Sequence, residues 1–147
     1  MTTTIGIDIG SGCVKSVLFR DGEWVAKRVE RIRRRDPMEL AKQGYDEVMA
    51  ESGLAANDVD YVATTGEGEN VKFATGHFYS MTTHARGAIF LDPQARAVVD
   101  IGALNGRAIY IDERGKVLSY KMTSQCASGS GQFLENISRY LGVAYRA

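Results

Sequence analysis

The sequence has 147 residues, which is the length of one ordinary domain. Eighteen basic side chains balance eighteen acidic ones, so no net charge attracts nucleic acid or a membrane surface, and neither partner is expected. No apolar run approaches the roughly 20 residues that cross a bilayer. The only cysteines are Cys13 and Cys126, which excludes a disulfide scaffold and predicts a cytoplasmic location.

An antiparallel meander of three strands is predicted at the start of the chain. Apolar residues alternate over 5–9, resume over 14–20 and return over 24–32. Gly10-Ser11-Gly12 marks the first bend, and Asp21-Gly22 is a strong hairpin turn signal at the second.

A helix is predicted after this meander. Asp36 suits the N-cap, Pro37 suits the first helical position, and Gly53 supplies the end. A short strand follows at 59–64, and a second helix is predicted to start at Thr82 or Thr83 and to end near residue 91.

The pattern then restarts, with strands predicted at 95–101, 107–112 and 117–122 and a helix at 129–141. Val99-Asp100-Ile101-Gly102 repeats Ile7-Asp8-Ile9-Gly10 after roughly 92 residues, which is the length of a half-domain and not of a short solenoid unit.

The repeat predicts two lobes. Residues 1–94 form a complete β-β-β-α-β-α lobe, and residues 95–147 begin a second lobe as β-β-β-α. The second lobe lacks the strands that would complete its sheet, so we expect the chain to be truncated. The isolated chain is therefore expected to bind its ligand weakly or not at all and to be inactive alone.

The first hairpin has the composition of a phosphate site. Gly10 and Gly12 are expected to take positive φ and turn their amides toward an anion. Ser11 adds a hydroxyl donor and Lys15 a point charge. Asp8 beside phosphates is best explained by a shared Mg²⁺ ion.

The second hairpin would supply Asp100 and Gly102 to the γ-phosphate side, where Asp100 could orient a water. For a single copy, a plain β-turn with an exposed Asp is the more common explanation. Two copies at the same place in a repeated unit favour a nucleotide site, with Asp8 and Asp100 as its catalytic residues.

Cys126 precedes a glycine-rich turn, Gly129-Ser130-Gly131, before the last predicted helix. The N-terminus of a helix binds anions, so Gly129 and Gly131 could contact phosphate. The same position stabilises a thiolate, which suits metal ligation by Cys126. A buried structural cysteine remains the usual alternative.

Two further features are less specific. His84 follows Thr83 at the predicted helix start, where a catalytic pair is possible but a capping Thr and an orienting or core His are more common. A basic run consists of Arg28, Arg31, Arg33, Arg34 and Arg35. Such a run is typical of a solvated face, and less often of a docking surface for an acidic partner or an anionic cofactor tail.

The chain resembles a known family along its whole length: the ATPase subunits of benzoyl-CoA reductase and the activators of 2-hydroxyacyl-CoA dehydratases. The motifs that carry the resemblance are Gly6–Gly12 with Lys15, Ala63–Gly66, His84–Ala88, Val99–Gly102 and Cys126–Phe133. Within the family, Tyr79–Gly87 and Met122–Cys126 are similar to the D-type ATPase subunits.

The resemblance implies an actin/hexokinase-like, ribonuclease H-like α/β ATPase fold, with the first lobe complete and the second truncated. It implies ATP and Mg²⁺ as ligands and a [4Fe–4S] cluster shared with a partner. It also implies a paralogous ATPase subunit, catalytic subunits that bind benzoyl-CoA, and a ferredoxin-like electron donor. The implied activity is ATP-driven electron transfer in the anaerobic degradation of aromatic compounds.

The sequence departs from the family pattern at two places. Thr83 stands where activators carry a cysteine, so only Cys126 matches a cluster ligand, whereas a cluster needs four thiolates. Ala103-Leu104-Asn105 follow Gly102, where activators carry Gly-Gln-Asp. A dehydratase activator, a sugar or acyl kinase of the same fold, and an inactive fragment or binding module remain as alternatives.

Overall fold

The computed structural model describes residues 1–102, 106–123, 137–138 and 140–143. The chain divides into two compact units, Met1–Thr83 and His84–Ala147. Most of the helix predicted at 129–141 lies outside the described residues, as do Cys126, Gly129 and Gly131. None of the helices in the described ranges is long and apolar enough to cross a membrane.

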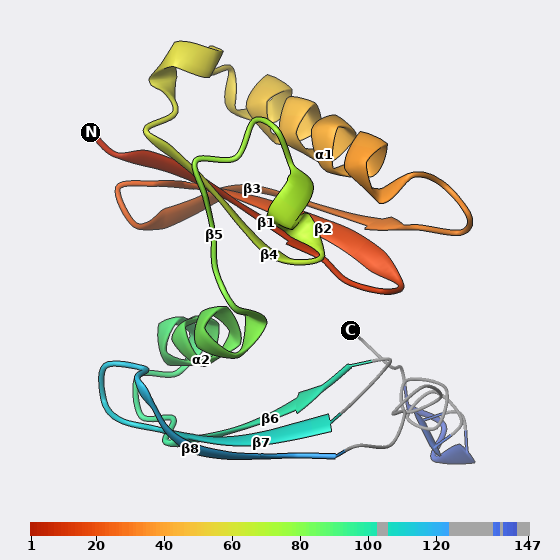
Figure 1. Ribbon diagram of the computed structural model, residues 1–147, viewed down its shortest axis with the longest axis vertical. Helices are drawn as coiled ribbons and strands as arrows, with labels where there is room; N and C mark the ends of the chain where they lie inside the picture. The colour runs from red at the N-terminus through yellow and green to blue at the C-terminus, as the bar shows by residue number, and fades with distance from the viewer. Residues whose placement is uncertain (103–105, 124–136, 139, 144–147) are drawn as a thin grey trace. The chain divides into compact units, whose positions relative to one another are not determined.

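The first unit is built on a mixed five-stranded sheet (Figure 1). Its central strand β1 pairs antiparallel with β2 and parallel with β4, and β3 and β5 are the edges. This confirms the predicted three-stranded meander. The strands are β1 (Thr3–Ile9), β2 (Cys13–Arg20), β3 (Glu23–Arg31), β4 (Tyr61–Gly66) and β5 (Gly76–His77).

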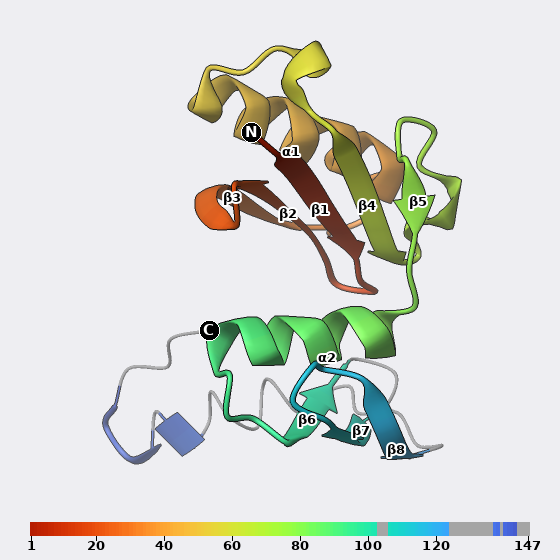
Figure 2. The same cartoon turned by 90° about the vertical axis from the view of Figure 1, so that its left-hand side faces the viewer.

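Helix α1 (Pro37–Ser52) covers one face of this sheet, as Figures 1 and 2 show. The predicted caps are confirmed: the Asp36 carboxylate accepts from the Met38 amide, and Gly53 ends the helix with a φ of 67°. The alternating residues Ile5, Ile7 and Ile9 of β1 are buried in the core that includes α1. The other face of β1 therefore carries Asp8.

The segments on either side of β4 contain elements that the sequence pattern did not predict. Two 3₁₀ turns, η1 (Ala56–Asp58) and η2 (Gly68–Asn70), flank β4, and β5 has only two residues. Pieces of two or three residues are too short to show a periodicity. The two-residue strand β5 exists only through its parallel pairing with β4.

Helix α2 (Ser80–Leu91) begins two residues before the earliest predicted start, Thr82. Thr83 therefore lies within the first turn, where its hydroxyl donates to the Ser80 carbonyl at 3.0 Å. The prediction that Thr83 caps the helix is wrong, because a cap stands before the first helical residue.

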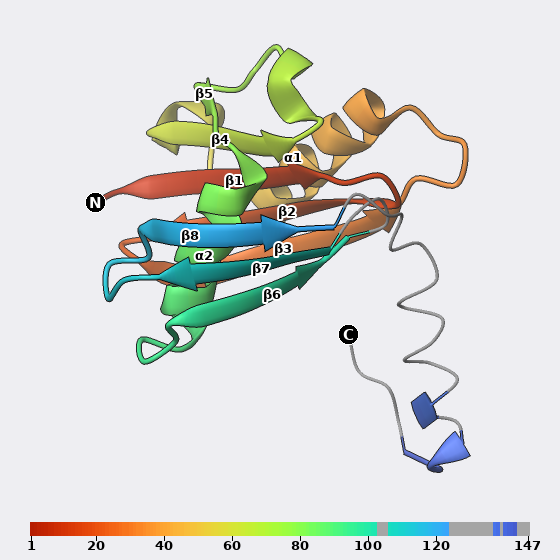
Figure 3. The same cartoon turned by 60° about the horizontal axis from the view of Figure 1, so that its bottom comes forward.

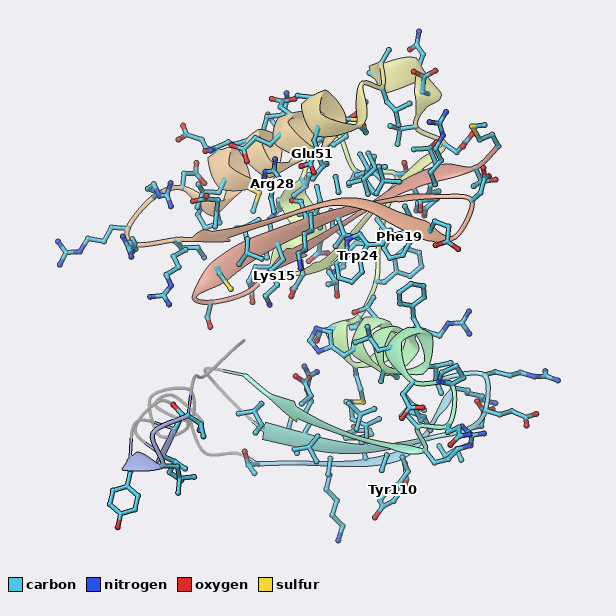
Figure 4. The ribbon with its side chains drawn as sticks, turned by 180° about the vertical axis from the view of Figure 1, so that it is seen from behind. Lys15, Phe19, Trp24, Arg28, Glu51 and Tyr110 are labelled. Carbon is cyan, nitrogen blue, oxygen red and sulfur yellow. The ribbon has the colours of Figure 1, made fainter. Side chains whose placement is uncertain are left out.

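The second unit contains an antiparallel sheet of β6 (Ala97–Ile101), β7 (Gly106–Ile111) and β8 (Val117–Met122), side by side in that order (Figure 3). The three predicted strands are confirmed. Ile109 is buried, whereas its neighbour Tyr110 projects from the opposite face and is exposed (Figure 4). The lobe boundary predicted at 94/95 stays a prediction.

Candidate functional site

Asp8 and Lys15 face each other across the first hairpin. They are direct partners in the β1–β2 register, and Lys15 Nζ lies 3.0 Å from Asp8 Oδ2. Lys15 projects from the sheet face opposite α1, as Figure 4 shows. The Lys15 side chain is 48% exposed and that of Asp8 22%. Both groups are therefore within reach of a ligand, and their mutual attraction is weakened by water.

The hairpin tip is closed by one backbone hydrogen bond, from the Gly10 amide to the Cys13 carbonyl at 2.9 Å. The prediction of positive φ at Gly10 and Gly12 is wrong. Glycine at position 10 instead avoids a tight contact, because a Cβ there would lie 3.3 Å from the Cys13 carbonyl oxygen. Ser11 and Gly12 are exposed at the tip, where the Ser11 hydroxyl can reach an anion.

The end of β4 completes this side of the site. Thr65 pairs with Asp8 in register, and its hydroxyl donates to the Phe78 carbonyl at 2.7 Å. Gly66 has a φ of 66°, and a Cβ there would lie 2.2 Å from the Ile9 carbonyl oxygen and 3.0 Å from Asp8 Oδ1. Only glycine lets β4 end this close to the Asp8 carboxylate.

In the second hairpin, Asp100 is held by two donors. Arg107, its direct partner in the β6–β7 register, reaches Asp100 Oδ2 at 2.5 Å, and His84 Nδ1 reaches the same oxygen at 2.9 Å. The Asp100 and Arg107 side chains are only 14% and 15% exposed. The sequence reasoning missed Arg107, although it follows Asp100 at the same spacing as Lys15 follows Asp8.

The arginine run lies on the surface, and two of its members form ion pairs there. Arg28 pairs with Glu47 at 3.2 Å and with Glu51 at 2.6 Å, and both acids lie on α1 (Figure 4). Arg35 pairs with Glu30 at 2.9 Å. The run is exposed apart from the half-buried Arg28, which agrees with the predicted solvated face, and the ion pairs add contacts that the linear sequence does not show.

The described residues do not make a metal centre by themselves. No group of three or more His, Cys, Asp or Glu side chains that could hold a metal occurs within the described ranges. Cys13, at the start of β2, is half-buried and free. Because the whole chain has two cysteines and one of them lies in the hairpin, its thiols cannot complete a four-thiolate cluster.

The solved structures of two dehydratase activators have the same fold. The activator component of (R)-2-hydroxyglutaryl-CoA dehydratase from Acidaminococcus fermentans matches with a TM-score of 0.79 and 28% identity, over 98% of this chain and 56% of that one. The 2-hydroxyisocaproyl-CoA dehydratase activator from Clostridium difficile, solved with bound ADPNP, matches with a TM-score of 0.76 and 28% identity, over 97% and 53%. The predicted actin-like ATPase fold is confirmed.

The chain belongs to the BadF/BadG/BcrA/BcrD ATPase family, whose model matches residues 5–147. It is 71% identical to the D subunit of benzoyl-CoA reductase from Thauera aromatica, over 98% of this chain and 52% of that protein. The resemblance drawn from the motifs is therefore confirmed. The chain spans about half the length of these relatives.

Proposed function

We propose that this chain belongs to the ATP-hydrolysing, electron-activating subunit of a benzoyl-CoA reductase. ATP hydrolysis would drive low-potential electrons into the ring of benzoyl-CoA for its reductive dearomatisation. The observation that carries the proposal is the 71% identity with the D subunit of the Thauera aromatica reductase along almost the entire chain. The partners would be a paralogous ATPase subunit, catalytic subunits that bind benzoyl-CoA, and a ferredoxin-like donor.

The first hairpin would hold the ATP phosphates. Lys15 would turn its ammonium from Asp8 to a phosphate oxygen, and Asp8 would then be available to hold Mg²⁺. Gly10, Ser11 and Gly12 would let the exposed tip approach the phosphates closely. Support comes from the 3.0 Å ion pair, from its exposure, and from the ADPNP bound by the Clostridium difficile relative.

Asp100 would accept a hydrogen bond from the attacking water, and Gly102 would contact the γ-phosphate. In the hydrolysis, the water oxygen bonds to the γ-phosphorus, the bond from phosphorus to ADP oxygen breaks, and the water proton leaves with phosphate or solvent. The protein's contribution is to position these groups and to neutralise charge.

Cys126 would be the one ligand of this chain to a shared [4Fe–4S] cluster, with the other thiolates from partner chains. Gly129 and Gly131 would add phosphate contacts at the following helix N-terminus. When bound, such a cluster relays single electrons. This chain's residues cannot complete the cluster, so the electron path would depend on the partner chains.

A dehydratase activator is the second candidate, favoured by the two matching solved structures. It would use the same phosphate residues to deliver electrons to a 2-hydroxyacyl-CoA dehydratase. The two candidates differ in the acceptor, so the same ATPase assembly distinguishes them when it is offered benzoyl-CoA or a 2-hydroxyacyl-CoA with the corresponding catalytic subunits.

The proposal is tested by anaerobic co-production with the partner subunits. We expect a brown assembly that contains iron and reduces benzoyl-CoA only with ATP, and loss of reduction in Cys126→Ser. Cys13→Ser is the matched control and should retain activity. An iron-free assembly, or full reduction by Cys126→Ser, would refute the electron-transfer role. Phosphorylation of a small molecule would identify a kinase instead.

A further inference from the structure

The Asp100 carboxylate is oriented asymmetrically by its two donors. His84 Nδ1 and an Arg107 guanidinium nitrogen both approach Oδ2, at 2.9 and 2.5 Å. Among the described residues, no hydrogen-bond donor to Oδ1 is found. Oδ2 is thus used for holding the side chain, and Oδ1 is left to accept from another molecule.

The pairing fixes the state of the imidazole. An ionised carboxylate can only accept hydrogen bonds, so Nδ1 of His84 must carry the proton in this contact. His84 lies on α2 and Arg107 on β7, so the carboxylate is fixed from a helix and from its neighbouring strand. Two donors from different elements define one orientation more strictly than a single ion pair does.

The first hairpin is different. Asp8 pairs with a lysine that is 48% exposed, whereas Asp100 pairs with an arginine that is 15% exposed. A lysine ammonium on a flexible stem can exchange partners, but a planar guanidinium holds a carboxylate in one geometry. The pair at Asp8 is suited to opening for Mg²⁺ and phosphate, and the cluster at Asp100 is suited to staying closed.

We infer that His84 and Arg107 are positioning residues that hold Asp100 by Oδ2, so that Oδ1 accepts the hydrogen bond of the hydrolytic water. The inference rests on the proposed ATPase function and assigns two residues to it. Loss of either donor lets the carboxylate rotate about its side-chain torsions. Misplaced groups lower the rate of the chemical step, while ATP binding at the first hairpin is preserved.

The kinetic test compares two amide replacements of His84 in the assembly purified with its partner chains. An Asn amide nitrogen takes the place of Nδ1, whereas a Gln amide nitrogen reaches the place of Nε2. We expect His84→Asn to retain most of the ATPase kcat, and His84→Gln and His84→Ala to lose about 10- to 100-fold with KM nearly unchanged. Arg107→Met should behave like His84→Ala.

Controls and a second readout keep the outcomes separate. His77→Ala changes the other histidine, and Arg96→Met changes an arginine that donates to the backbone carbonyls of Pro93 and Ala95; both variants should keep kcat. Equal activity of His84→Asn and His84→Gln, or a change confined to KM, would overturn the inference.

An NMR measurement on the same chain labelled with ¹⁵N-histidine does not depend on activity. A hydrogen-bonded Nδ1 proton of His84 should be seen and should disappear in Asp100→Ala, which removes the acceptor; its absence in the wild type would also overturn the inference. If the wild-type assembly hydrolyses no ATP, the proposed function fails, and this signal still decides whether His84 holds Asp100.

Discussion

Replacement of Gly66 by alanine should destabilise the first unit and displace Asp8. The φ of Gly66 is 66°, where an L-residue costs about 1–2 kcal/mol. The added Cβ would lie 2.2 Å from the Ile9 carbonyl oxygen, a backbone atom of the central strand that cannot move alone. Relief of such overpacking costs about 1–3 kcal/mol, so the total loss should be about 2–5 kcal/mol.

Two glycines of the same unit provide matched controls. Gly22 has a φ of 81° with nothing within 4 Å of an added Cβ, so Gly22→Ala isolates the cost of backbone strain, about 1–2 kcal/mol. Gly6 has neither a positive φ nor a neighbour within 4 Å, so Gly6→Ala should change stability by less than about 0.5 kcal/mol.

Urea unfolding monitored by tryptophan fluorescence measures all three variants. Trp24 is the only tryptophan, and it stacks on Phe19 in the first unit, with ring centroids 6.0 Å apart. The signal therefore reports on this unit. A loss in Gly66→Ala no larger than that in Gly22→Ala would refute the close approach of β4 to β1 on which the site depends.

Three more predictions concern individual side chains. Lys15→Met should weaken binding of ADPNP by the assembly at least tenfold in calorimetry. It should change the free energy of unfolding by less than about 1 kcal/mol, because the ion pair is half-exposed. Lys42→Met, which breaks a similarly exposed pair on α1, should leave binding unchanged. Asp36→Ala should cost about 1 kcal/mol in urea unfolding through loss of the α1 N-cap, and no loss would contradict the capping contact. The hydrogen bond from the Lys116 amide is the main cause that holds the pKa of Asp112 below its usual 3.8. The stabilisation of the β7–β8 turn by the ionised Asp112 is therefore present above pH 3.8 and is lost as the pH falls through the lowered pKa. The protection factor of the Lys116 amide, which is its exchange rate relative to an unstructured amide at the same pH, should fall over that range. It should already be low at neutral pH in Asp112→Ala, which removes the acceptor, and equal protection in the variant would contradict the contact.

The sequence was sufficient to predict the helices and strands whose residue pattern is local. Alternation predicted the strands around Asp8 and Asp100, and the Asp36 and Gly53 signals located the ends of α1. These features depend on neighbours a few residues apart. For the same reason, the repeat of the two hairpins could be read from the letters alone.

The missed features depend on residues distant in the sequence. Arg107 becomes part of the site only through the β6–β7 register. Gly66 was named in the motif Ala63–Gly66, but its place beside Asp8 follows only from the parallel pairing of β4 with β1. The contact of His84 with Asp100 likewise requires α2 to pack beside β6. No periodicity within one segment reports such contacts, although the common spacing of Asp8–Lys15 and Asp100–Arg107 was available as a signal.

The most direct measurement is a parallel assay of ATP hydrolysis and benzoyl-CoA reduction by the anaerobically purified assembly, with the wild-type chain and with Asp8→Asn. If Asp8 serves ATP hydrolysis that drives electron transfer, the wild-type assembly hydrolyses ATP as it reduces benzoyl-CoA, and both rates fall together in the variant. Benzoyl-CoA reduction at the wild-type rate in Asp8→Asn, or in the wild type without ATP, would contradict the coupling of this hairpin to electron transfer.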